Sequence, residues 1–191
     1  MVENWIDVNK IQDGTDSALC WAAAAANALS YTGWANESPE EIFDLIKSET
    51  GNVKNAAAAG IYVFVRRHLK SISPLNMYVK LLPSSSLWVC HGMKERGACA
   101  ILGLLNDYID PGHVITAYET VIKENTEIED VRSIKQFICT DSDDTLGEPF
   151  PQEREITVNI DYDITSKQLN TDYILNKRKS FIDLAVLVLP R

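Results

Sequence analysis

The pattern of apolar and polar positions is helical in the first half of the chain and extended in the second. Residues Asp16–Tyr31 read DSALCWAAAAANALSY and are apolar on every face of a helix, which predicts a helix buried on all sides. Alanine is a strong helix former with almost no side-chain bulk, so other elements can pack close to this helix. We expect Asp16 or Ser17 to cap its start and Gly33 to end it.

Further helices are expected downstream of this one. Ser38, Pro39 and two acidic residues are typical of a helix start, and Gly51 of its end. Asn55–Leu69 and Ser84–Arg96 also fit helices, although the middle of the first of these segments could instead form a strand.

Strand-like segments dominate the second half. Ala98–Leu105 is a continuous apolar run typical of a buried central strand, and Phe181–Leu189 is another. Alternating apolar and polar positions predict the other strands, which are Trp5–Val8, Leu75–Leu82, His113–Tyr118, Ile134–Thr140 and Glu155–Ile160. Helices followed by strands predict an α+β fold with an antiparallel sheet, formed by one domain over residues 1–191.

Two of the predicted strands flank a polar, mostly acidic stretch. This arrangement predicts an antiparallel β-hairpin that pairs His113–Tyr118 with Ile134–Thr140. In such a pair the start of the first strand lies beside the end of the second. We therefore expect His113 to lie beside Thr140–Asp143, which contains two aspartates.

Composition and charge restrict the classes of protein. The 191 residues are 46% hydrophobic and 24% charged, as in an ordinary globular domain, and the net charge is −9. An acidic chain argues against nucleic acid and anionic membrane surfaces as partners. No apolar run reaches the roughly 18 residues that span a bilayer. The first residues lack the basic and apolar regions of a signal peptide, so either the protein is cytoplasmic or a signal has been removed.

The four cysteines are widely spaced, at Cys20, Cys90, Cys99 and Cys139. This spacing fits neither a disulfide scaffold nor a zinc site, and adding His91 as a ligand does not produce a zinc pattern. We expect free thiols, three of them buried and inert, and neither a metal nor a cofactor.

Cys20 differs from the other cysteines because it lies at the start of a predicted helix. Unpaired N–H groups and the helix dipole favour a thiolate there. A cysteine nucleophile also needs a base and a group that orients the base, and His113 and Asp141 are the candidates. Each residue alone has an ordinary structural explanation. Their chain order, and Trp21 directly after Cys20, match papain-like enzymes.

Several short stretches carry a family resemblance. They are Trp5–Lys10, Leu19-Cys20, Gly97–Leu105 followed by His113–Ile115, and Thr140–Asp143. Together they resemble the IdeS/Mac family of immunoglobulin-degrading cysteine endopeptidases, from Trp5 to near Thr145. The resemblance implies a papain-like fold, in which an N-terminal helical half with a buried catalytic helix packs on an antiparallel β-sheet half.

The resemblance also implies roles for individual residues. Cys20 would be the nucleophile and His113 its base, with Asp141 orienting His113 and Asp143 in support. Lys10 would take the oxyanion-hole position, where a cation stabilises both an oxyanion and a thiolate.

Gln12 is the rival donor to Lys10. Papain has a glutamine six residues before its cysteine, but Gly14 occupies that position here.

The function implied is a thiol protease that hydrolyses peptide bonds of a protein substrate, with host immunoglobulin as one candidate. We expect a monomer that is secreted or on the cell surface and contributes to virulence. Immunoglobulin specificity does not carry over, because the recognition surfaces cannot be aligned. Two alternatives stay open: an amidase or transglutaminase-like acyl-transfer enzyme on the same fold, and a non-catalytic binding domain.

Overall fold

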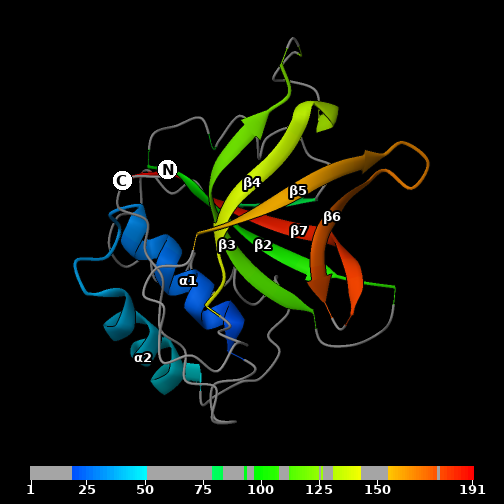
Figure 1. The fold of residues 1–191 in the computed structure, drawn as a ribbon. Helices are drawn as coiled ribbons and strands as arrows, with labels where there is room; N and C mark the ends of the chain where they lie inside the picture. The colour runs from blue at the N-terminus through cyan, green and yellow to red at the C-terminus, as the bar shows by residue number, and fades with distance from the viewer. Residues whose placement is uncertain are drawn as a thin grey trace.

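The computed structural model describes residues 19–50, 79–83, 93, 97–107, 112–124, 126, 131–142, 155–175 and 177–191. Within these residues two helices precede seven strands (Figure 1). The helices are α1 (Cys20–Tyr31) and α2 (Pro39–Thr50), and a short 3-10 helix, η1, covers Val131–Ser133. The strands are β1 (Val79–Pro83), β2 (Cys99–Leu105), β3 (His113–Ile122), β4 (Ile134–Thr140), β5 (Glu155–Asp163), β6 (Gln168–Leu175) and β7 (Arg178–Val188).

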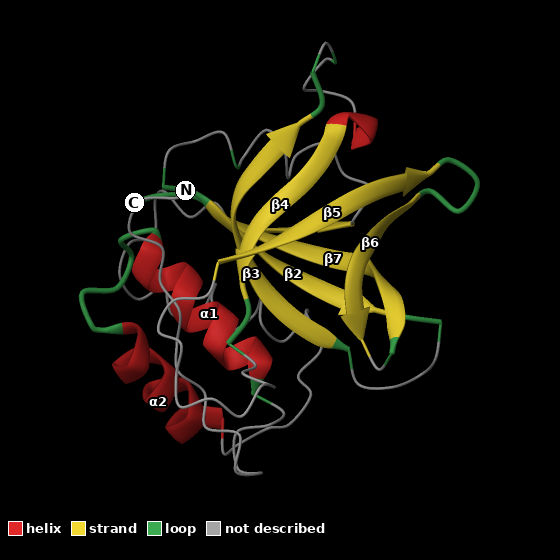
Figure 2. Cartoon of the chain, viewed as in Figure 1, coloured by secondary structure: helices red, strands yellow, loops and turns green. Residues whose placement is uncertain are grey.

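Six of the strands form a closed antiparallel barrel. Their order is β7-β2-β3-β4-β5-β6, and β6 pairs again with β7 to close the ring. The remaining strand, β1, pairs with the C-terminal part of β7. Figure 2 shows the strands curling around a common axis, with both helices together on one side.

The predicted papain-like α+β fold is wrong. The described residues are mostly strand, in a closed six-stranded antiparallel barrel with only two short helices, rather than a helical half packed on a sheet half. The error has a physical cause, since hydrophobic periodicity reports which face of a strand is buried and not which strand it pairs with. The predicted elements Trp5–Val8, Asn55–Leu69 and most of Ser84–Arg96 lie outside the described residues.

Helix α1 starts later than the sequence pattern predicted. Leu19 occupies the N-cap position and makes no side-chain capping hydrogen bond, so Cys20 is the first helical residue. The predicted end is confirmed: Gly33 has φ +75° and the N–H of Trp34 donates to the carbonyl of Leu29 at 3.1 Å. A left-handed glycine in this pattern closes a Schellman motif.

The predicted start of α2 is also confirmed. The hydroxyl of Ser38 accepts a hydrogen bond from the N–H of Glu41 at 3.2 Å, and the Glu41 carboxylate accepts one from the N–H of Ser38 at 2.9 Å. This reciprocal pair is a capping box, which satisfies two backbone donors at the helix start.

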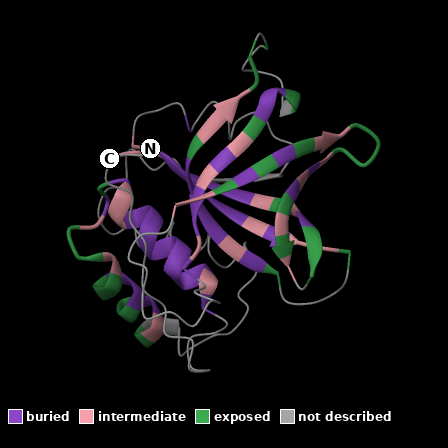
Figure 3. Ribbon diagram, viewed as in Figure 1, coloured by how far each residue is buried: buried purple, intermediate pink, exposed green. Residues whose placement is uncertain are grey.

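Two hydrophobic cores lie on opposite sides of the barrel wall. The inner core fills the barrel with inward-facing side chains such as Leu102, Phe137 and Ile182. The outer core contains α1, residues of α2 and outward-facing side chains of β2, β3 and β7. Figure 3 shows α1 buried along most of its length, whereas α2 exposes one side. The prediction of a helix buried all round is therefore confirmed.

The alanines of α1 allow its backbone to approach the barrel closely. The hydroxyl of Thr116 on β3 donates to the carbonyl of Ala24 at 3.5 Å, and the thiol of Cys99 on β2 donates to the carbonyl of Ala28 at 4.0 Å. Side chains of the barrel wall thus contact the helix backbone directly. A larger residue on this side of α1 would separate the two layers.

We predict that Ala28→Leu destabilises the protein by about 1–3 kcal/mol, because Ala28 is fully buried and has no room for three more carbons. Urea unfolding followed by circular dichroism measures this change. The control is Asp44→Leu on the exposed side of α2, which should change the free energy of unfolding by no more than about 0.5 kcal/mol. Equal stability of the two variants would show that α1 does not pack as described.

Candidate active site

The candidate site lies at one end of the barrel. His113 is the first residue of β3, Asp141 directly follows β4, and Tyr173 is near the end of β6. Antiparallel pairing of β3 with β4, and of β5 with both β4 and β6, brings these positions to the same end. Figure 1 shows the first turn of α1, which carries Cys20, at this end.

The β3–β4 hairpin positions His113 and Asp141. Thr116 pairs with Thr140 and Ala117 with Cys139, which confirms the predicted antiparallel pairing. Nε2 of His113 lies 2.7 Å from Oδ1 of Asp141, and the two side chains are only 7% and 14% exposed. A charge-assisted hydrogen bond of this length, shielded from water, is among the stronger polar contacts in proteins.

Tyr173 is a residue of the site that sequence reasoning missed. Its hydroxyl donates a hydrogen bond to Oδ2 of Asp141, the oxygen that His113 does not contact. Its ring stacks beside the His113 imidazole, with ring centroids 5.8 Å apart and planes 19° from parallel. The only sequence signal was the alternation of Leu169, Thr171 and Tyr173, whose side chains would share one face of a strand.

Cys20 is the second neighbour of His113 in the site. Its side chain is half-buried and lies close enough to the imidazole to raise the pKa of His113. Because Nε2 of the imidazole faces Asp141, Nδ1 is the ring nitrogen left for the thiol. Cys20 is also the first residue of α1, where backbone N–H groups lack partners within the helix.

The charge state of His113 reflects both neighbours. Burial alone would lower the pKa of the imidazole, but hydrogen bonds to Asp141 and Cys20, and the charges of both groups, raise it to about 10. The site therefore favours an imidazolium at neutral pH.

A buried hydrogen bond ties α1 to the end of β4. Nδ2 of Asn27 donates to the hydroxyl of Ser142 at 3.3 Å, and Asn27 is fully buried. Ser142 directly follows Asp141, so this contact fixes the helix that carries Cys20 relative to the strand end that carries Asp141.

The other described cysteines have a different environment. Cys99 and Cys139 are free and fully buried. Burial raises the pKa of both thiols well above the ordinary value, and the charge of Asp141 adds to this effect at Cys139. Their predicted burial is confirmed, and their inertness stays a prediction that the raised pKa supports, whereas Cys90 lies outside the described residues.

Three other residues of the predicted site lie outside the described residues: Lys10, Gln12 and Asp143. The donor for an oxyanion therefore stays a prediction, as does the supporting role of Asp143.

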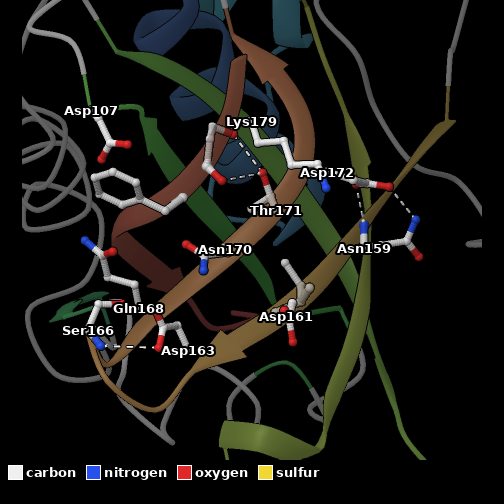
Figure 4. Close-up of a pocket in the computed structure, with 13 residues that line it drawn as sticks. Asp107, Asn159, Asp161, Asp163, Ser166, Gln168, Asn170, Thr171, Asp172 and Lys179 are labelled. Atoms are coloured by element: carbon white, nitrogen blue, oxygen red, sulfur yellow. Dashed lines mark hydrogen bonds between the residues drawn. The ribbon is translucent and has the colours of Figure 1, made fainter.

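A polar groove of about 620 Å³ lies elsewhere, along β5, β6 and β7 (Figure 4). Much of its polarity is structural. For example, the Asp172 carboxylate accepts hydrogen bonds from the backbone N–H of Asn159 at 2.8 Å and from its side-chain amide at 2.5 Å. Cys20, His113 and Asp141 do not line this groove, so we assign the chemistry to the barrel end.

Two further properties concern the described part of the chain alone. It contains no cluster of three or more histidine, cysteine or acidic residues suited to holding a metal ion. None of its helices has the length and apolar character needed to cross a membrane.

Comparison with known proteins gives no family assignment, because no family model matches the chain and no curated protein is significantly similar to it.

Protonation of His113 should make stability depend on pH. The folded-state pKa of about 10 exceeds the ordinary value of 6.5, so the native state holds an extra proton between these values. The resulting stabilisation is complete below about pH 6.5 and is lost as the pH rises through the folded-state pKa.

We predict this decline in the Cys20→Ala protein, where the thiol no longer titrates and Asp141 remains the partner of His113. Urea unfolding at several pH values from 6 to 10 measures it, and Cys20→Ala/His113→Asn is the matched control. If the difference in unfolding free energy between the two proteins stays constant over this pH range, the charge state assigned to His113 is contradicted.

Proposed function

We propose that the protein is a cysteine endopeptidase in which Cys20 is the nucleophile. The observation that carries the proposal is the series Cys20–His113–Asp141, assembled from a helix start and two strand ends at one end of the barrel. His113 and Asp141 are hydrogen-bonded, and Cys20 lies close enough to the imidazole to act on its charge state. A nucleophile, a base in contact with it and a group that orients the base are the parts that covalent acyl transfer needs.

The proposed reaction has two stages. The Cys20 thiolate attacks the carbonyl carbon of a peptide bond, and a tetrahedral oxyanion forms. The His113 imidazolium then donates its proton to the leaving amine, which leaves an acyl-enzyme thioester on Cys20. In the second stage neutral His113 takes a proton from water, the hydroxide attacks the thioester, and the carboxylic acid and the thiolate are released.

The oxyanion needs donors in both stages. The backbone N–H of Cys20 is one candidate, since it belongs to the first helical residue. We propose the Lys10 side chain as the second donor, on the basis of the sequence resemblance alone.

The choice of peptide bonds as the substrate rests on the resemblance to the IdeS/Mac endopeptidases, and so do immunoglobulin as a candidate substrate and a secreted or cell-surface location. The barrel differs from the fold that this resemblance implied. The geometry at Cys20 therefore supports the catalytic class more strongly than the resemblance supports the substrate.

We predict that Cys20→Ala lowers turnover by about three orders of magnitude or more without unfolding the protein, because it removes the nucleophile and little volume. The assay incubates the protein with immunoglobulins and a broad panel of other proteins and identifies products by mass spectrometry. The control is Cys99→Ala, which removes a buried thiol far from His113 and should retain activity if the protein folds.

The products identified in this assay also distinguish endopeptidase activity from the amidase and acyl-transfer activities. Cleaved peptides indicate an endopeptidase, conversion of side-chain amides to acids indicates an amidase, and cross-linked products indicate an acyl transferase. Cleavage that persists in Cys20→Ala would rule out the mechanism.

A further inference from the structure

We propose that Tyr173 is a positioning residue of this site, which holds the Asp141 carboxylate in the plane that orients the His113 imidazole. Its importance for catalysis rests on the proposed function, but its effect on Cys20 can be measured without a substrate.

The two oxygens of Asp141 have different partners. Oδ1 faces Nε2 of His113 at 2.7 Å, and Oδ2 accepts the hydroxyl hydrogen of Tyr173. One hydrogen bond leaves a carboxylate free to rotate, whereas donors on both oxygens define its plane. The Tyr173 hydroxyl also stabilises the ionised form of the carboxylate, since hydrogen bonds to a charged form favour it.

The Tyr173 ring contacts the second member of the series as well. It lies beside the His113 imidazole at a centroid separation of 5.8 Å and an angle of 19°. An aromatic face near a cation is attractive, so the ring favours the protonated imidazole. One residue thus acts on both the base and the group that orients it.

A β-bulge aims Tyr173 at the site. Asn170 pairs with Phe181 and Ile174 with Lys179, so the three residues between them on β6 face one residue, Ser180, on β7. Bulges redirect side chains and are frequent beside active sites.

Two buried hydroxyl groups hold the bulge in place. The N–H of Tyr173 donates to the Thr171 hydroxyl at 3.2 Å, and the Ser180 hydroxyl donates to the carbonyl of Tyr173 at 3.1 Å. The two hydroxyls lie 2.7 Å apart, and both residues are almost fully buried. Polar side chains are costly inside a barrel unless they satisfy other polar groups, and here they satisfy the backbone of Tyr173.

The test is the rate of Cys20 alkylation by iodoacetamide as a function of pH, measured by intact mass. Tyr173→Phe keeps the ring and removes the hydroxyl. We expect its alkylation rate near neutral pH to fall about tenfold, a typical effect of losing a hydrogen bond to a charged group. The acid limb of the pH–rate profile for Cys20 alkylation should move to higher pH in this variant, because a less well oriented imidazolium assists the sulfur less.

Tyr162→Phe is the matched control, because Tyr162 is a partly buried tyrosine on the neighbouring strand β5. In this variant Cys20 should be alkylated at the wild-type rate and with the wild-type pH profile. A purely structural role for Tyr173 would lower the unfolding free energy and leave the pH profile unchanged. If Tyr173→Phe does not fold, Ser180→Ala must move the acid limb in the same direction, since it leaves the Tyr173 side chain intact and frees its carbonyl.

The outcomes separate the two proposals. A wild-type Cys20 that alkylates like an ordinary thiol, with a pKa of about 8.5, overturns the proposed function. A wild-type Cys20 that is reactive at lower pH, together with an unchanged profile in Tyr173→Phe, overturns the role of Tyr173 alone.

Discussion

The antiparallel pairing of β3 with β4 is the constraint on which both the barrel and the site depend. It brings His113, at the start of one strand, against Asp141, at the end of the other. A register shift of one residue would turn His113 to the opposite face of the sheet. Because α1 packs against β3, the same pairing also determines where Cys20 lies. Residues distant in sequence thus meet through one local hairpin and one helix contact.

Stability and chemistry occupy different parts of the same barrel. Apolar side chains fill most of its interior, while a group of hydrogen-bonded polar side chains lies at one end. His113, Asp141 and Tyr173 form one such group, and the Asn27–Ser142 hydrogen bond joins it to α1. The alanines of α1 let this helix approach closely enough for that hydrogen bond to form.

Much of this could be predicted from the sequence, where single elements or adjacent strands were involved. The burial of α1, the start of α2, the strands β2 and β7 and the hairpin that joins His113 to Asp141 all follow from periodicity and capping. The closed barrel could not be predicted, because polar residues interrupt the apolar pattern of β6 and a bulge between Asn170 and Ile174 interrupts its pairing with β7. Tyr173 was missed for the same reason, since its place depends on that closure.

The central claim is that His113 is held as an imidazolium by its neighbours Asp141 and Cys20. The titration of the imidazole tests it most directly, by comparing the histidine ring signals of wild type and His113→Asn by NMR as the pH is raised. We predict that the signal missing from His113→Asn stays in its protonated position through neutral pH, because the pKa of His113 is raised to about 10. A His113 signal that titrates near the ordinary value of 6.5 would contradict the claim.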